Sequence, residues 1–133
     1  MAVRSQVRNP PWPTTSDAFN SECPAREVLD HITSRWGVLI LTALGGGGPL
    51  RFSELHGMIG GISEKMLSQT LRTLVRDGLV VRAVEPTTPP RVSYDLTTLG
   101  QGLTESLQQF LEWVRKHTVD VVAAQHRHDK QRG

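Results

Sequence analysis

Apolar residues recur three and four positions apart through much of the chain, which is the period of an amphipathic helix. The first such segment begins at Pro24, because proline is tolerated at the first helical position. A second segment carries Trp36 and ends at Gly45. A third, short segment has Ser53 as its expected N-cap and ends near residues 60–61. The pattern therefore predicts two helices and then a short third one.

A fourth helix, from Glu64 to Asp77, has the clearest division into two faces. Ser63 is its expected N-cap, and Gly78 stops it. We expect one face to be buried and the other to be exposed. The buried face comprises Met66, Leu67, Thr70, Leu71 and Leu74, and the exposed face comprises Lys65, Ser68, Gln69, Arg72 and Arg76.

Alternating apolar and polar residues, or valine-rich runs, mark the strands. Leu50 to Phe52 is a short extended stretch, Leu79 to Glu85 is rich in valine, and Val92 to Leu96 has a period of two. A loop with three prolines, residues 86–90, joins the last two segments into a hairpin. A helix pair followed by such a hairpin is typical of a winged helix-turn-helix, in which the short first stretch can complete a three-stranded sheet.

A long helix is predicted after the hairpin, with a capping box formed by Thr98 and Gln101. Its apolar face is longer than a small core needs. We therefore expect this helix and the first helix to form the two-fold interface of a homodimer. The apolar face comprises Leu99, Leu103, Leu107, Phe110, Leu111 and Val114.

The expected fold is mainly α with a small β-wing, a dimeric winged helix-turn-helix of the α+β class. Three prolines between residues 10 and 13 prevent regular structure, so residues 1–22 are expected to form a flexible N-terminal arm. The domain with its dimerisation helices is expected to span residues 23–117. Residues 118–133 are expected to be a C-terminal extension or tail, because the sequence is polar and basic from His126.

Composition excludes several classes of protein. The 133 residues are 38% hydrophobic and 21% charged, which suits one compact domain. The single cysteine excludes an internal disulfide framework and a Cys-based zinc finger. The longest apolar run, Val38 to Leu44, is far shorter than the roughly 20 residues of a membrane span, and Met1 to Pro13 lacks the apolar core of a signal peptide. We expect a cytoplasmic protein with no membrane partner.

No known catalytic or cofactor motif is present. The five histidines do not have metal-ligand spacing, and the glycine run lacks the Lys and Ser or Thr of a P-loop. No nucleophile elbow is present either. The sequence therefore predicts no metal, no cofactor and no enzymatic activity.

The net charge of +2 is small, so the position of the charges must identify the partner. The exposed face of the fourth helix offers cationic, amide and hydroxyl groups. Arg and Lys can bind guanine or phosphate, and Gln can bind adenine. A solvated helix face has the same composition, so this helix alone leaves both interpretations open. The expected DNA-binding residues are Arg51, Ser63, Lys65, Ser68, Gln69, Arg72, Arg76 and Arg91.

The predicted wing supports the DNA interpretation. Arg82 and Arg91 flank its proline-stiffened loop, around Glu85. An arginine at a wing can reach the minor groove or the adjacent phosphates. A hairpin with solvated arginines is the alternative.

Cys23 is a second candidate for chemistry. It lies directly before the first helix, roughly at its N-cap. The amides of a helix N-terminus favour a thiolate, and Arg26 lies one turn further on, whereas Glu22 and Glu27 oppose that charge. The alternative is an inert, buried side chain, as free cysteines often are.

Several motifs in combination resemble the HxlR-type winged-helix regulators, which are relatives of MarR. The resemblance covers roughly residues 22–117 and is most specific at the block beginning with Ser63 and at the Pro-Pro-Arg-Val sequence of the wing. The matching segments are Cys23-Pro24-Ala25, Trp36 with Leu39-Ile40-Leu41, Arg51-Phe52-Ser53-Glu54-Leu55, Ile62-Ser63-Glu64-Lys65-Met66-Leu67-Ser68, Leu71-Arg72 through Leu74, Asp77-Gly78-Leu79-Val80, Pro89-Pro90-Arg91-Val92-Ser93-Tyr94 and Leu96-Thr97 through Gly100.

The resemblance implies a homodimeric bacterial transcription regulator. Several members use a cysteine at the position of Cys23 as a redox or electrophile sensor, and the resemblance extends that role to Cys23. The chain departs from the family at Ser34-Arg35-Trp36, where Gly-Lys-Trp is common, and in the loose glycine run at 45–48.

We therefore predict a sequence-specific transcriptional regulator, a repressor that binds a palindromic operator in double-stranded DNA as a homodimer. Its signal would be an oxidant acting at Cys23 or a small molecule bound at the dimer interface. Trp36, Phe110 and Trp113 could line such a pocket, although core packing accounts for each of them as well. The alternative function is a winged-helix module that binds another protein and not DNA.

Overall fold

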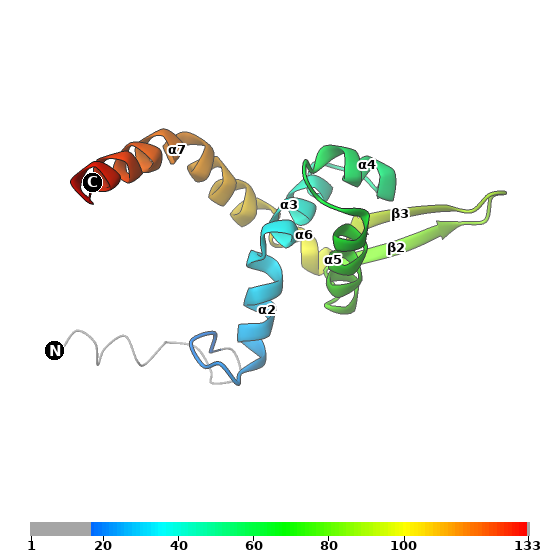
Figure 1. Ribbon diagram of the computed structural model, residues 1–133. Helices are drawn as coiled ribbons and strands as arrows, with labels where there is room; N and C mark the ends of the chain where they lie inside the picture. Colours follow the sequence, from blue (N-terminus) through cyan, green and yellow to red (C-terminus); the bar gives the residue numbers. More distant parts are fainter. Residues whose placement is uncertain (1–16, 133) are drawn as a thin grey trace.

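The structure is a computed structural model that describes residues 17–132, and it has the predicted winged helix-turn-helix architecture (Figure 1). Helices and a three-stranded antiparallel sheet follow one another in the expected order, which confirms the mainly helical fold with a small wing. The elements are α2 (Pro24–Thr33), α3 (Arg35–Leu44), β1 (Leu50–Arg51), α4 (Phe52–Met58), α5 (Glu64–Arg76), β2 (Val80–Glu85), β3 (Arg91–Leu96), α6 (Thr98–Gln101) and α7 (Thr104–Arg132).

The core lies where α3 and α5 meet the start of the sheet. Leu67, Leu71 and Leu74 of α5 are almost fully buried, as the helical period predicts. Met66 was predicted on the same face but is 40% exposed, because its side chain lies at the edge of α5 beside α2. The other core residues are Ile40, Leu41, Leu44, Leu55, Ile59, Ile62, Leu79, Val80, Leu96 and Leu107.

Both ends of α5 are fixed by local hydrogen bonds. The Ser63 hydroxyl accepts from the backbone N–H of Met66 at 3.0 Å, which confirms Ser63 as the N-cap. At the other end Gly78 has a φ of +76°, a left-handed conformation that favours glycine. Its N–H donates to Val75, and the N–H of Leu79 donates to Leu74, which closes the last turn in a Schellman motif.

The sheet has the strand order β1-β3-β2, so the short first strand does complete the wing sheet. Arg51 lies opposite Ser93, and Glu85 lies opposite Arg91. In Figure 1 the β2–β3 hairpin extends well beyond the helices, to the right of α5. A molecule that binds the exposed side of α5 could therefore also contact the wing loop.

Two predicted N-caps are wrong by one or two residues. Helix α4 begins at Phe52, so Arg51 is its N-cap and Ser53 lies inside the helix. Helix α6 is capped by Thr97, whose hydroxyl accepts from the N–H of Gly100 at 3.0 Å, and not by a capping box at Thr98. The strand before α4 ends at Arg51, one residue earlier than the pattern suggested, whereas the strand before α6 ends at Leu96 as predicted.

The predicted last helix differs from the structure at both ends. A break around Gly102 separates α6 from α7, and this break leaves Leu99 66% exposed, away from the apolar face of α7. At the C-terminal end α7 continues to Arg132, so the expected tail is helical and the expected boundary at residue 117 falls within one helix. Figure 1 shows this distal part projecting from the domain.

The expected N-terminal arm lies mostly outside the described residues. Its prolines and its first 16 residues cannot be compared with the structure. Residues 17–22 form turns before α2, and Arg26 donates hydrogen bonds to the carbonyl oxygens of Ala18 at 2.6 Å and Phe19 at 3.0 Å. These bonds attach the turns to α2.

Candidate nucleic-acid interface

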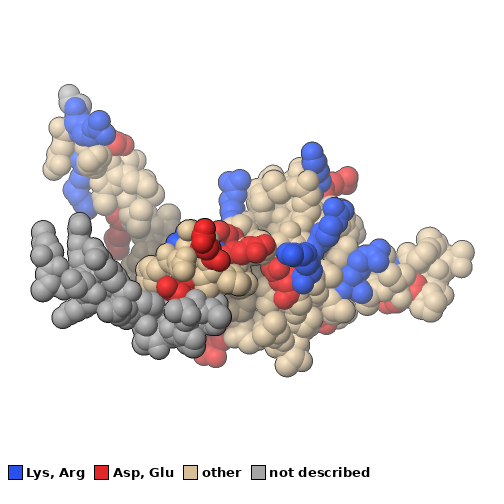
Figure 2. Space-filling view, turned by 90° about the horizontal axis from the view of Figure 1, so that it is seen from below, with Lys and Arg blue, Asp and Glu red and all other residues tan. Residues whose placement is uncertain are grey.

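Helix α5 presents a polar and cationic face to solvent. Lys65, Gln69, Arg72 and Arg76 are exposed and Ser68 is half-buried, because the leucines of the helix turn the opposite way into the core. Figure 2 shows Lys and Arg side chains gathered across α5 and the base of the wing, with acidic side chains to their left. The predicted site residues of α5 therefore share one accessible surface.

The sheet register brings Arg51 and Arg91 to one side of the wing. Arg51 pairs with Ser93, and Arg91 precedes Ser93 by two residues, so both arginines lie on the same face of the sheet. Both line a hollow of about 580 Å³ between the start of α4 and the wing loop. Two guanidinium groups beside a hollow suit a phosphate group, because arginine forms strong charge-assisted hydrogen bonds with phosphate oxygens.

Arg76 and Ser63 differ from the other predicted site residues in already having partners. A guanidinium nitrogen of Arg76 lies 3.8 Å from a carboxylate oxygen of Glu27 on α2, and both side chains are largely exposed. Such a surface pair is weak. The Ser63 hydroxyl is committed to capping α5. Both residues lie at the ends of the helix, so Lys65, Gln69 and Arg72 form the centre of the interface.

Cys23 is the N-cap of α2, as the sequence predicts. The residue is only 7% exposed, and its carbonyl oxygen accepts the N–H of Arg26. The guanidinium group of Arg26 is directed to the carbonyl oxygens of residues 18 and 19. The thiol is therefore largely shielded from solvent.

Two helices carry exposed apolar residues outside the core. No residue of α2 is buried, and its Val28 and Leu29 are 45% and 43% exposed. On α7, Phe110 and Trp113 are each 53% exposed. Leu107, in contrast, is 8% exposed and belongs to the core, so it is not available to an interface in the way its place in the apolar pattern suggested.

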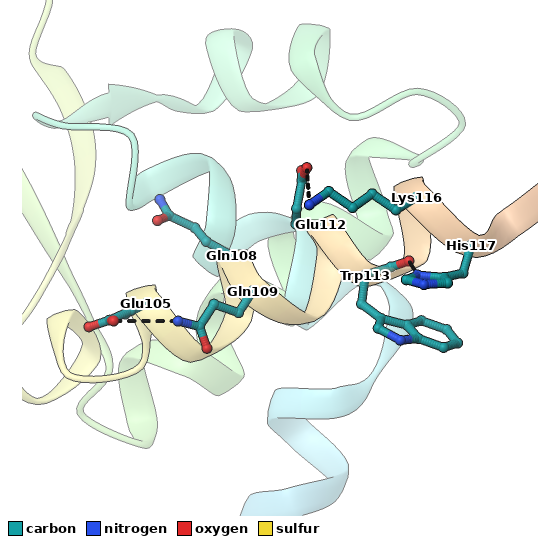
Figure 3. Close-up of a pocket in the computed structure, with 7 residues that line it drawn as sticks. All are labelled: Glu105, Gln108, Gln109, Glu112, Trp113, Lys116 and His117. Carbon is teal, nitrogen blue, oxygen red and sulfur yellow. Dashed lines mark hydrogen bonds and ion pairs between the residues drawn. The ribbon is translucent and has the colours of Figure 1, made fainter.

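Within residues 17–132, none of the hollows that the structure describes is lined by Trp36, Phe110 and Trp113 together. Trp36 packs against the core, and Phe110 does not line the hollow beside Trp113 (Figure 3). In this hollow, of about 610 Å³, the Trp113 ring stacks on His117 with centroids 4.6 Å apart. Its lining residues come from α7 alone and are mostly polar: Glu105, Gln108, Gln109, Glu112, Trp113, Lys116 and His117. It is therefore a surface groove of one helix.

The charged residues of that groove pair along the helix. Glu112 lies 3.9 Å from the ammonium nitrogen of Lys116 (Figure 3). The hydrogen bond from Arg115 lowers the pKa of Glu112 below its ordinary value. These are exposed pairs within one helix, and they point to a solvated surface.

Within residues 17–132, no three His, Cys, Asp or Glu side chains come together in a way that could hold a metal ion. In the same part of the chain, none of the helices combines the length and apolar character that crossing a membrane requires. The cationic surface of α5 and the wing is thus the feature of the described structure that best suits a macromolecular partner.

Comparison with known proteins identifies the family. The model of the HxlR-like helix-turn-helix family matches residues 31–121. The chain belongs to this family. It is 49% identical over 105 residues to the HTH-type transcriptional regulator YtfH of Escherichia coli K12, itself uncharacterized, and the match covers 79% of this chain and 82% of YtfH.

Several solved structures share the fold. YtfH of Salmonella typhimurium is 44% identical with a TM-score of 0.77, over 83% of this chain and 97% of that one. Diamide-treated YodB from B. subtilis is 35% identical with a TM-score of 0.60, over 73% and 96% of the two chains. The redox regulator HypR in its oxidized form is 34% identical with a TM-score of 0.65, over 71% and 96%.

As a member of the HxlR-like family, the chain is an HTH-type transcriptional regulator and not an enzyme, and DNA is the partner that this implies. Sequence reasoning missed two features of the interface. It did not place Arg51 beside Arg91, because strand register cannot be derived from alternation alone. It also missed the contacts between α2 and the end of α5, because they join residues far apart in the chain.

Proposed function

We propose that this chain binds a palindromic operator in double-stranded DNA as a homodimer and represses transcription by occluding a promoter. The observation that supports this most is the exposed cationic face of α5, which carries Lys65, Arg72 and Arg76. In helix-turn-helix proteins, the N-terminal part of such a helix enters the major groove. The experiment that tests the proposal is selection of bound DNA from a random pool.

Each predicted residue has a role that fits its place. Lys65 and Arg72 are suited to guanine edges or phosphates, and Gln69 to adenine. Ser63 and Ser68 lie at the same end of α5 and can bind a phosphate or a base edge. Arg51, Arg76 and Arg91 lie at the periphery, where phosphate contacts position a protein without selecting sequence.

The exposed apolar residues of α2 and α7 support a homodimer. Val28, Leu29, Phe110 and Trp113 would be covered if the same two helices of a second copy packed against them. A two-fold axis through this interface would place the two copies of α5 in successive major grooves, one helical turn or roughly 34 Å apart.

The alternative is a winged-helix module that binds a protein and not DNA. The two functions differ in their response to salt. Each phosphate contact releases condensed counterions, so DNA affinity falls steeply as salt concentration rises. Association with another protein through apolar contacts, in contrast, is nearly insensitive to salt.

We expect Arg91→Ala to weaken binding to all DNA sequences about equally. A wing arginine that contacts a phosphate contributes affinity but little sequence preference, and its loss reduces the salt slope by about 1 per contact. A symmetric dimer loses both copies, so the slope should fall by about 2. Fluorescence anisotropy over a range of salt concentrations measures this.

Arg127→Ala is the matched control, because Arg127 is an exposed cation on distal α7, outside the α5 and wing surface. This control should leave both affinity and slope unchanged. If Arg91→Ala instead changes which sequence is preferred and keeps full affinity, the wing reads bases directly, and the positioning role of Arg91 is wrong.

We further propose that Cys23 receives a redox signal. Its place at the N-cap of α2 supports this, as do YodB, whose structure has been solved after diamide treatment, and the redox regulator HypR. Diamide can take up the hydrogens of two thiols as a disulfide forms between Cys23 of two protomers. Because the thiol is buried, this bond requires α2 or the preceding turns to move.

Diamide is therefore expected to lower the DNA affinity of the wild type and to leave Cys23→Ser unaffected. The lone cysteine makes the comparison direct, since no other thiol in the chain can respond. Anisotropy before and after treatment, followed by addition of a reductant, measures the change and its reversal. An equal response of both proteins, or of neither, would make Cys23 structural and leave the dimer-interface ligand as the proposed signal.

A further inference from the structure

A partly buried polar contact joins α2 to the end of α5. The Nδ1 atom of His31 lies 2.6 Å from a carboxylate oxygen of Asp77, although the two residues are 46 positions apart in the sequence. The side chains are only 22% and 12% exposed. The N–H of the ring donates to the carboxylate.

Asp77 is an unexpected residue for its position. It is the C-cap of α5, where the helix dipole disfavours a carboxylate. Its backbone N–H closes the helix by donating to Thr73, so the side chain is not needed for capping. A partner with a donor or a positive charge offsets this unfavourable placement, and His31 is that partner.

Helix α2 has few other contacts that fix its angle to α5. None of its residues is buried, and Ile32 is the residue of α2 that packs against the core. The second polar contact with α5, between Glu27 and Arg76, has a separation of 3.8 Å and is largely exposed. Of the two polar contacts described between α2 and the end of α5, the His31–Asp77 hydrogen bond is therefore the shorter and the less exposed.

We propose that His31 is a positioning residue for DNA recognition, which holds α2 and α5 at one fixed angle through Asp77. The inference rests on the proposed function, in which α2 belongs to the dimer interface and α5 enters the major groove. The angle between these helices then sets the separation and tilt of the two copies of α5 in the dimer. Loss of the bond loosens that geometry without removing any group that contacts DNA.

Charged groups on both helices surround the imidazole. Its Nε2 atom lies 3.7 Å from a carboxylate oxygen of Glu27. Asp30 and His31 both line a small hollow between α2 and α5. From α5, Asp77 faces the ring, and Arg76 approaches Glu27. The Nδ1–H that faces Asp77 is within hydrogen-bond distance of its partner, whereas the separation between Nε2 and Glu27 is longer.

The test uses the full chain and DNA that the wild type selects from a random pool. His31→Ala should lower affinity about tenfold, as expected for loss of a hydrogen bond to a charged group. His31→Asn should restore most of that loss, because its amide N–H can replace the Nδ1–H.

Asp30→Asn is the matched control, because it removes a carboxylate from the same turn of α2 without touching the bond to Asp77. It should stay within about twofold of the wild type, since exposed charges contribute little. Denaturant unfolding and sedimentation establish that each variant is folded and dimeric. If His31→Ala does not fold, the DNA affinity of His31→Asn carries the test.

The positioning role is wrong if His31→Ala binds like the wild type. It is also wrong if His31→Asn loses as much affinity as His31→Ala or, where His31→Ala does not fold, if His31→Asn itself loses about tenfold. Failure of the wild type to select any DNA is a different result. It would contradict the proposed function, and the role of His31 would fall with it.

Discussion

Phe110→Asp is expected to convert the dimer into a monomer and to lower affinity for the operator at least 100-fold. Phe110 is 53% exposed in the single chain and lies on the face of α7 that the proposed interface covers. Removing a buried phenylalanine costs about 1.5–3 kcal/mol per copy, and a buried carboxylate without a partner adds to this. A monomer holds one half-site and loses the gain in affinity that comes from binding two linked sites.

Val119→Asp is the matched control for this experiment. Val119 is 76% exposed and lies nine residues further along α7, about half a turn around the helix from Phe110. The control should stay dimeric and bind DNA as the wild type does. Sedimentation velocity and anisotropy on the same samples measure both properties. A Phe110→Asp dimer, or a monomer with full operator affinity, would contradict an interface built on α7.

The structure determines which residue of α7 can be used in this test. Leu107 is the residue that the apolar pattern suggests, but it is buried in the core of its own chain. An aspartate there would destabilise the fold itself, so the loss of DNA binding would not identify an interface. Phe110 lies one turn further along and is exposed, which separates the two effects.

The double variant Lys65→Ala/Arg72→Ala is expected to lose at least about 1,000-fold in DNA affinity while it remains a folded dimer. Each lost contact costs about 1–3 kcal/mol, and four contacts are lost in a dimer. At the lower limit this is about 4 kcal/mol, or nearly three factors of ten. Both side chains are exposed on α5 and make no contact that the fold needs.

The two single variants distinguish the roles of these residues. Loss of a base contact should relax preference at one position of each half-site, whereas loss of a phosphate contact should lower affinity for every sequence. Arg127→Ala again serves as the control for loss of a cation outside the interface. Unchanged affinity in the double variant would show that α5 does not contact DNA, and would favour the protein-binding alternative.

Much of the fold could be predicted because local signals agree with one another. In α5 the leucine period, the Ser63 cap and the stop at Gly78 point to the same helix, and the structure places all three as expected. The hairpin was equally clear, because Val92, Tyr94 and Leu96 alternate with polar residues. The exposed face of α5 followed directly from the buried one.

What could not be predicted depends on contacts between distant parts of the chain. Arg51 comes beside Arg91 only through the pairing of β1 with β3, and His31 reaches Asp77 only through the packing of α2 beside α5. Val119, Val121 and Val122 allowed for an extension of the last helix, but the polar and basic sequence from His126 did not indicate that α7 continues to Arg132.

Selection of bound DNA from a random pool tests the central claim most directly, because it examines DNA recognition and two-fold symmetry together. The account predicts enrichment of an inverted repeat whose half-site centres lie roughly 10 base pairs apart, as expected for two copies of α5 one helical turn apart. Binding to this sequence should weaken steeply with salt. Enrichment of no sequence, or of a single site without two-fold symmetry, would contradict a homodimeric regulator that reads DNA with α5.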